Sequence, residues 1–358
     1  MNRRLSLLCL TLCLSATSVF AVEGERIVFP AQRHEENRLI IHAATDLEAM
    51  RPLVLDFQQM EPNTAVEIAD YVTNDLFREA VVACTDSSQT ADILLSSSVD
   101  QLVKLANDGC ARAHQSVETG SVPDWANWRN EVFGFTFEPA VFVYDARHVP
   151  KEDVPKSHEA LADLLRRKPG EYQGRIGTYD INASGVGYLL AFNDARLAPT
   201  VYGRLLESLS RTTAVIRCCN NEVLGEIANG NIRIAYNVLG SYAYAAYLKN
   251  PDLKIVVPRD YTLILSRGAM IPLRAANPDL GARFLNYLLS VRGRKTARDK
   301  SFFFANGFDL PPGVDGPLSL IESGIGRPIR IGPALLAAQD EAQRRRFIRD
   351  WQDLILRR

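Results

Sequence analysis

A buried strand followed at once by a capped helix stands near the start of this sequence, and the same unit recurs. Residues 38–44 form an uninterrupted apolar run, which is typical of a strand buried on both faces of a parallel sheet. Thr45 and Glu48 then match a capping box, with Thr45 as the helix cap. Further strands are predicted at 65–70 and 91–96. This alternation predicts βαβ units and an α/β fold class.

A second group of strands and helices is separated from the first by extended chain. Residues 132–145 are predicted to be extended, and Pro139 within them marks a strand edge or a crossing between domains. The segment 253–262 is interpreted as the return crossing. The predicted parts are a discontinuous first lobe at 38–140 and 262–358, a second lobe at 145–255, and crossings near 132–145 and 253–262.

The length and charge of the chain fit two globular lobes. Its 358 residues are enough for two domains, and 47% of them are hydrophobic, so a substantial core can be buried. The 41 Lys and Arg residues nearly balance the 42 Asp and Glu residues, which gives a net charge of -1. No overall basic field is available to recruit nucleic acid.

Residues 1–21 are predicted to be a secretory signal peptide. Arg3 and Arg4 precede a short apolar run, and small residues then lead to Ala21. Cleavage after Ala21 would release a mature protein into the periplasm, and the alternative is an uncleaved anchor.

Four cysteines remain after this segment, in a compartment that permits disulfides. Cys84 and Cys110 are the preferred pair, because both flank one short strand–helix segment. Cys218 and Cys219 are adjacent, so they either form a strained vicinal disulfide or stay reduced. No CxxC spacing occurs and the chain has only 5 His, so no cysteine metal site is predicted.

Polar residues follow four of the predicted strands. Thr45 follows the first strand, Ser97 the third, Ser184 and Gly185 lie in a Gly/Ser loop, and Asn220 stands before a helix. Such residues at helix starts favour bound anions, although the same residue types are also the best helix caps. Ligands bind outside the carboxyl ends of parallel strands, so these positions are predicted to share one cleft.

Two charged residues near these positions would affect the binding of an anion. Asp46 would repel a phosphate, and its preferred interpretation is a helix cap. Arg217 could supply the opposite charge, or it could equally be exposed.

Several stretches of the chain resemble a known protein family. The stretches SGVGYLLA from Ser184 and AYNVLGSYA from Ala235 are the most specific part of a similarity that covers most of residues 38–310. The chain resembles the bacterial extracellular solute-binding proteins of ABC transporters, most closely the branch of ferric-iron and phosphoglycerate-type receptors. The resemblance implies the type II periplasmic-binding fold, with two lobes, each a mixed sheet flanked by helices, and a ligand cleft between them.

The resemblance also implies roles for particular residues. Thr45 and Ser97 would contact ligand from the first lobe, and Ser184 and Gly185 from the second. Asn237 and Tyr242 would approach the cleft from the turn at 238–243. Ferric-binding relatives use an adjacent tyrosine pair at that turn, whereas this chain has Tyr242 followed by Ala243, which weakens the iron interpretation.

The favoured function is a periplasmic receptor that delivers a small, anionic solute to an ABC permease. It is expected to act as a monomer, without cofactor, metal or nucleic acid. The alternatives are a ligand-sensing partner of a two-component sensor kinase and a ferric-iron-binding protein. An enzyme is not predicted, because the loop at Ser184 does not match GxSxG and the histidines are scattered.

Overall fold

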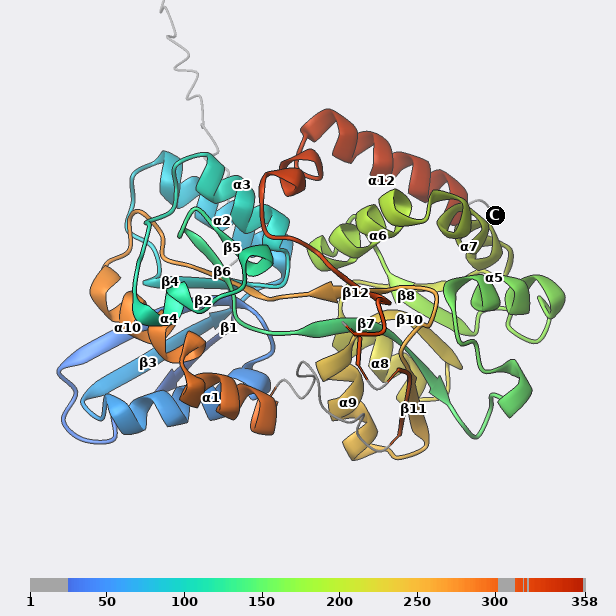
Figure 1. Ribbon diagram of the computed structural model, residues 1–358, viewed down its shortest axis with the longest axis horizontal. Coiled ribbons are helices and arrows are strands. Elements are labelled where there is room, and N and C mark those ends of the chain that lie inside the picture. Colours follow the sequence, from blue (N-terminus) through green and yellow to red (C-terminus); the bar gives the residue numbers. More distant parts are fainter. Residues whose placement is uncertain (1–24, 302–312, 318, 321, 357–358) are drawn as a thin grey trace, which may run out of the picture.

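The computed structural model describes residues 25–301, 313–317, 319–320 and 322–356. These residues form two lobes side by side, each built on one sheet with helices on both faces (Figure 1). Both sheets combine parallel and antiparallel pairs, so the predicted two-lobed α/β fold class is confirmed. The predicted signal peptide, residues 1–21, lies outside the described residues.

The first lobe holds a sheet with the strand order β1-β3-β2-β4-β13-β6-β5. Its central strands β3, β2 and β4 run parallel, and β1 pairs with β3 in the antiparallel direction. The strands are β1 Glu25–Phe29, β2 Asn37–Ala44, β3 Thr64–Asp70, β4 Ile93–Ser96, β5 Asn127–Trp128, β6 Val132–Gly134 and β13 Gly268–Met270.

Helices cover both faces of this sheet because successive strand residues point to opposite sides. On one face, Phe57 of α1 and Phe284 of α10 meet with their ring centres 5.0 Å apart. On the other face, Leu76 of α2 and Leu102 of α3 pack against the sheet. The helices are α1 Leu47–Met60, α2 Thr73–Thr85, α3 Val99–Asn107, α4 Val117–Gly120, α10 Pro278–Leu289 and α11 Val291–Thr296.

A disulfide ties two helices of the first lobe together. It joins Cys84, in the last turn of α2, to Cys110, which follows α3. The two cysteines are 26 positions apart in the sequence, so the bond closes a loop that contains β4 and α3.

The second lobe holds a sheet with the strand order β14-β11-β7-β10-β8-β9, and β12 pairs with β7 and β15. Strand β10 is parallel to β8 and antiparallel to β7. The strands are β7 Glu138–Asp145, β8 Ile176–Tyr179, β9 Val215–Arg217, β10 Ile234–Leu239, β11 Leu253–Val256, β12 Thr262–Leu265, β14 Val314–Asp315 and β15 Gly326–Pro328.

Two groups of helices cover the second sheet. Helices α5, α6, α7 and α12 contribute to one core, and α8 and α9 contribute to the core on the opposite face. The helices are α5 His158–Arg167, α6 Gly185–Leu197, α7 Pro199–Arg211, α8 Asn220–Ala228, α9 Gly240–Lys249 and α12 Glu341–Ile355. None of the described helices is long and apolar enough to cross a membrane.

The chain crosses between the lobes beside a buried ion pair. It leaves the first sheet after Gly134, enters the second at Glu138, and returns between Leu265 and Gly268. At the crossing, Arg267 Nε donates a hydrogen bond to Glu138 Oε1 at 2.7 Å, and both side chains are 1% exposed. The pair therefore fixes the two crossing segments to each other.

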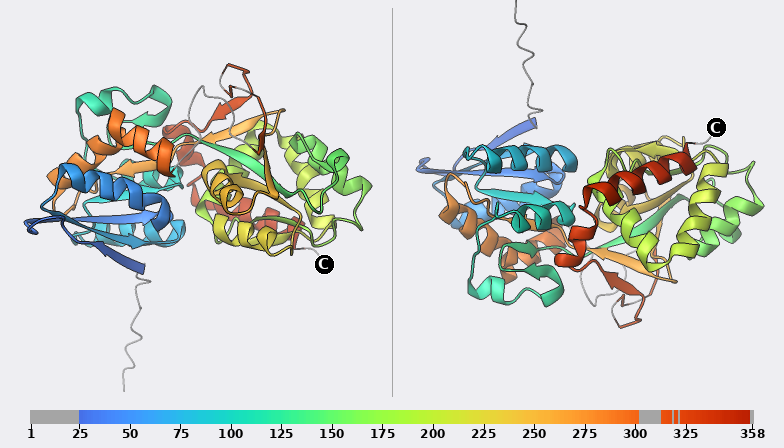
Figure 2. Two further views of the ribbon diagram at one scale, coloured as in Figure 1. Left: turned by 90° about the horizontal axis from the view of Figure 1, so that it is seen from below. Right: turned by 90° about the horizontal axis from the view of Figure 1, so that it is seen from above.

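Two of the predicted lobe boundaries are wrong. The C-terminal part of 262–358 belongs to the second lobe, because β12, β14 and β15 join its sheet and α12 packs on α7 (Figures 1 and 2). Ile348, Trp351 and Ile355 of α12 are buried in the core of that lobe. Helical periodicity shows that one face is buried but does not identify its partner. The return crossing also comes after 253–262, because β12 completes the second sheet first.

Candidate functional site

A cleft of about 350 Å³ lies between the strand ends of the two lobes. The first lobe contributes the residues that follow β2, β3 and β4, and the second contributes the turns that open α6, α8 and α9. Of the predicted site residues, five line this cleft: Thr45, Ser97, Ser184, Asn220 and Tyr242. Strand ends gather at one edge of each sheet, which brings together residues that are far apart in the sequence.

The wall from the first lobe carries buried hydroxyl groups. Thr45 is not the cap of α1, since Asp46 takes that position and its Oδ1 accepts from the Glu48 backbone N–H at 2.9 Å. The Thr45 hydroxyl, 2% exposed, instead accepts a long hydrogen bond of 3.4 Å from Arg267 Nη1. Ser97 is 4% exposed and lines the cleft directly after β4.

The wall from the second lobe begins at the N-terminus of α6. Ser184 caps this helix, and its Oγ accepts from the Gly187 backbone N–H at 3.1 Å. Gly185 does not line the cleft; its backbone N–H donates to Thr73 Oγ1 of the first lobe at 2.9 Å. A Cβ at position 185 would lie 2.5 Å from Ser98 Oγ, so only glycine allows this approach. Gly185 is thus a contact between the lobes.

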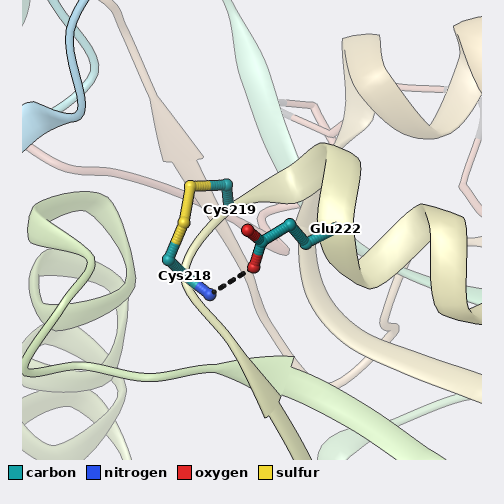
Figure 3. Close-up of side chains that lie close together, drawn as sticks. All are labelled: Cys218, Cys219 and Glu222. Carbon is teal, nitrogen blue, oxygen red and sulfur yellow. Dashed lines mark hydrogen bonds between the residues drawn. A yellow bond between two sulfur atoms is a disulfide. The ribbon is translucent and has the colours of Figure 1, made fainter.

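A vicinal disulfide forms the adjoining part of this wall. Cys218 and Cys219 are bonded to each other and both line the cleft. The Cys218 backbone N–H donates to Glu222 Oε2 at 3.1 Å (Figure 3). Together these residues form the one group of three or more His, Cys, Asp or Glu ligand atoms that converges within 4.8 Å in the described chain. With its sulfurs joined in a disulfide, this group cannot offer two thiolates to a metal.

Two predicted site residues in the second lobe face other partners. Arg217 pairs with Glu226, with Nη2 and Oε1 2.6 Å apart, and does not line the cleft. Asn237 adopts a φ of 64° at an irregularity in β10, and its Nδ2 donates to the buried Asp194 at 2.7 Å. The expected approach of Asn237 to the cleft is therefore wrong, because the irregular strand directs its amide to Asp194.

Asn220 and Tyr242 support the cleft in different ways. The Asn220 Oδ1 accepts hydrogen bonds from the Tyr179 hydroxyl at 2.5 Å and from the Leu239 backbone N–H at 3.0 Å. These bonds hold the Asn220 side chain against the ends of β8 and β10. The Tyr242 hydroxyl accepts from the Asp46 backbone N–H at 3.2 Å across the cleft. Its ring lies 5.0 Å from the Arg267 guanidinium carbon.

The comparisons with known proteins agree with this architecture. The family model described as bacterial extracellular solute-binding protein matches residues 39–303. The chain belongs to this family. The predicted resemblance is confirmed, and the two lobes form the type II periplasmic-binding fold. No curated protein matches the sequence.

Solved structures extend the likeness of this solute-binding protein over nearly the whole chain. The substrate-binding protein of an ABC transporter from Agrobacterium tumefaciens is 31% identical, with a TM-score of 0.84, and the match covers 92% of this chain and 98% of that one. Iron-bound HitA from Pseudomonas aeruginosa is 18% identical, with a TM-score of 0.71 and coverage of 88% and 99%. AfuA from Actinobacillus pleuropneumoniae, solved with fructose-6-phosphate, is 17% identical, with a TM-score of 0.70 and coverage of 90% and 99%. The last two show the fold alone.

Side-chain amides also join the lobes of this solute-binding protein beside the cleft. Asn74 Nδ2 donates to the backbone oxygens of Asn182 and Ala183, at 3.1 and 2.9 Å. Asn221 Nδ2 donates to Asp46 Oδ2 at 2.7 Å. The structure is therefore in a conformation with the lobes in contact.

Acidic side chains in the cleft are the main feature that the sequence analysis missed. Glu25 and Asp70 line it together with Asp46, and the lining contains no Lys or Arg among the described residues. Burial, followed by the carboxylates of Asp46 and Glu25, raises the pKa of Asp70 to about 7. Glu25 was missed because β1 was not predicted. Asp70 stands at the end of a predicted strand, and that position was the available signal.

Proposed function

We propose that this protein is the periplasmic receptor of an ABC importer and holds one small polar solute between its lobes. The observation that carries the proposal is the cleft lined from both lobes by hydroxyl, amide and carboxylate groups. A ligand that contacts both walls favours the closed form, and that form would present a joint surface to the permease. The mechanism is binding and closure without a covalent step.

The expected location and assembly follow from the same features. An extracellular family supports a periplasmic site of action, reached after removal of residues 1–21. A monomer is sufficient, because one chain supplies both walls of the cleft.

The solutes named for structural neighbours have less support here. Iron-bound HitA suggests Fe(III), but Tyr244 packs on Tyr247 with ring centres 5.8 Å apart and does not line the cleft beside Tyr242. A sugar phosphate, as in AfuA, or the anion predicted from the strand ends has no Lys or Arg among the cleft-lining residues to pair with. Arg217 does not supply one, since it pairs with Glu226.

Binding of a solute in the cleft, measured by its effect on thermal stability, tests the proposal. A thermal-shift screen of amines, amino acids, sugars, carboxylates, phosphorylated metabolites and ferric citrate should give at least one solute that stabilises the mature protein. At 100 times its dissociation constant, a ligand adds about 2.7 kcal/mol. Ser184→Trp should remove that shift, because the indole would occupy the cleft.

Ser157→Trp is the matched control. Ser157 caps α5 as Ser184 caps α6, but it does not line the cleft. This variant loses an equivalent cap and should still bind the solute. A normal shift for Ser184→Trp, or no shift by any solute with the wild-type protein, would contradict the proposed function.

A further inference from the structure

Three carboxylates reach the cleft from neighbouring strands of the first lobe. Asp70 ends β3, where it pairs in register with Glu25 of β1 on one side and with Ala43 of β2 on the other. Asp46 follows β2 by two residues. All three acidic residues line the cleft, so the sheet itself gathers negative charge at this edge.

No described basic side chain neutralises this charge, although Asp46 Oδ1 caps α1 and its Oδ2 accepts from Asn221. No Lys or Arg in the described ranges forms an ion pair with any of the three carboxylates or lines the cleft beside them. Arg267 lies behind the wall, where the Glu138 carboxylate, 2.7 Å from it, already balances its charge. The raised pKa of Asp70 has burial as its main cause and reflects the same lack of compensation.

A hydroxyl group lies beside these acids. Ser97 lines the cleft and only 4% of the residue is exposed. Among the described residues its Oγ has no hydrogen-bond partner, and it is not one of the fully buried atoms, so it opens to the cleft. Ser97 is therefore suited to bind a polar group of the solute.

The arrangement fits an organic cation better than a metal ion. Glu25, Asp46 and Asp70 do not form a group of three with ligand oxygens within 4.8 Å of one another, so no carboxylate cage is preformed. Tyr71 and Tyr242 also line the cleft, and aromatic residues attract organic cations. A space of about 350 Å³ suits a small metabolite.

We propose that the solute carries a cationic nitrogen, as an ammonium or guanidinium group, which Asp46 and Asp70 bind while Ser97 takes one further hydrogen bond. Glu25 adds to the attraction at the mouth of the site. This inference rests on the proposed receptor function and specifies its substrate class. It replaces the anion expected from the sequence.

Cationic solutes and solutes without a net positive charge test the substrate class at pH 8. The cation set is putrescine, agmatine and choline; the comparison set is succinate, citrate, fructose 6-phosphate, glucose and ferric citrate. At least one cation should raise the melting temperature, and titration calorimetry should show binding at a single site. Asp70→Asn should weaken that binding at least tenfold.

Glu48→Gln is the control for loss of charge alone. Glu48 lies two residues after Asp46 but pairs with Arg51 outside the cleft, so this variant should bind within a factor of two of wild type. Binding of an anion, a sugar or ferric citrate that Ser184→Trp abolishes would overturn the cation class and leave the receptor function intact. Failure of every solute in both sets would overturn both.

Discussion

Asp70 destabilises the folded protein when it ionises, because its carboxylate is largely buried beside two others. Burial comes first among the causes that raise its pKa from 3.8 to about 7, followed by Asp46 and Glu25. The folded state therefore holds this proton more tightly than the unfolded chain. The stability that the proton provides is complete below about pH 4 and is lost as the pH rises through about 7.

Asp70→Asn should consequently stabilise the protein at high pH. We expect a gain of about 1 kcal/mol at pH 8, since water partly screens this carboxylate, and no gain near pH 4. Urea unfolding at both pH values measures the difference. Glu36→Gln, at an exposed site in the same lobe, should change stability at neither pH. An equal gain at both pH values for Asp70→Asn would refute the titration argument.

Single residues show where sequence reasoning succeeds at the site and where it fails. Thr45, Ser97 and Ser184 line the cleft, because a polar residue after a buried strand lies at the strand-end edge, and their contact with ligand stays a prediction. Asn237 failed, since a local irregularity with positive φ turned its side chain to Asp194. The acidic character of the cleft was not predicted either, because whether an acid has a basic partner depends on distant segments.

At the scale of elements, the Cys84–Cys110 disulfide fixes α2 to the segment after α3. Replacing both cysteines with alanine frees a loop of 26 positions, and we expect a loss of about 3 kcal/mol. Urea unfolding without reductant measures it. The double replacement of Cys218 and Cys219 by serine is the control, since that bond spans adjacent residues and constrains almost no loop. Equal losses for the two pairs would contradict this account.

Helix α12 shows that helical periodicity does not determine which part of the protein a helix packs against. Its sequence is amphipathic, and its apolar face must pack against another part of the protein. Which lobe covers it depends on the surface exposed by α7 and on the path of the chain through β14 and β15, and neither is encoded in the helix itself. By contrast, the ends of α5 can be read from the sequence, because Ser157 caps its start and Pro169 and Gly170 follow its end.

Trp351→Ala tests the assignment of α12 to the second lobe. Trp351 is 4% exposed in the core formed with α5, α6 and α7, so its removal should cost about 3–5 kcal/mol. Hydrogen exchange should become faster in α7 and stay unchanged in α10 of the first lobe. Leu354→Ala, on the exposed side of the same helix at 39% exposure, should have little effect. Faster exchange in α10 alone would return the helix to the first lobe.

At the scale of the whole molecule, the balance between open and closed forms depends on the contacts between the lobes. Asn74 makes two of them, to the backbone oxygens of Asn182 and Ala183, and it does not line the cleft. It thus contributes to closure without touching the solute. A residue of this kind changes affinity by changing the population of the closed form.

Asn74→Ala should therefore open the solute-free protein and weaken binding together. The variant also loses the bond that Asn74 Oδ1 accepts from Gln101 Nε2 within the first lobe. The two lost hydrogen bonds between the lobes amount to about 1–2 kcal/mol, or roughly a tenfold weaker affinity. Small-angle scattering without solute should give a larger radius of gyration, and saturating solute should restore the wild-type value. Asn231→Ala, which removes a hydrogen bond to Glu226 within the second lobe, should alter neither quantity. Weaker binding with an unchanged radius of gyration would mean that Asn74 acts on the site itself, and the two lobes would then not close as the contacts imply.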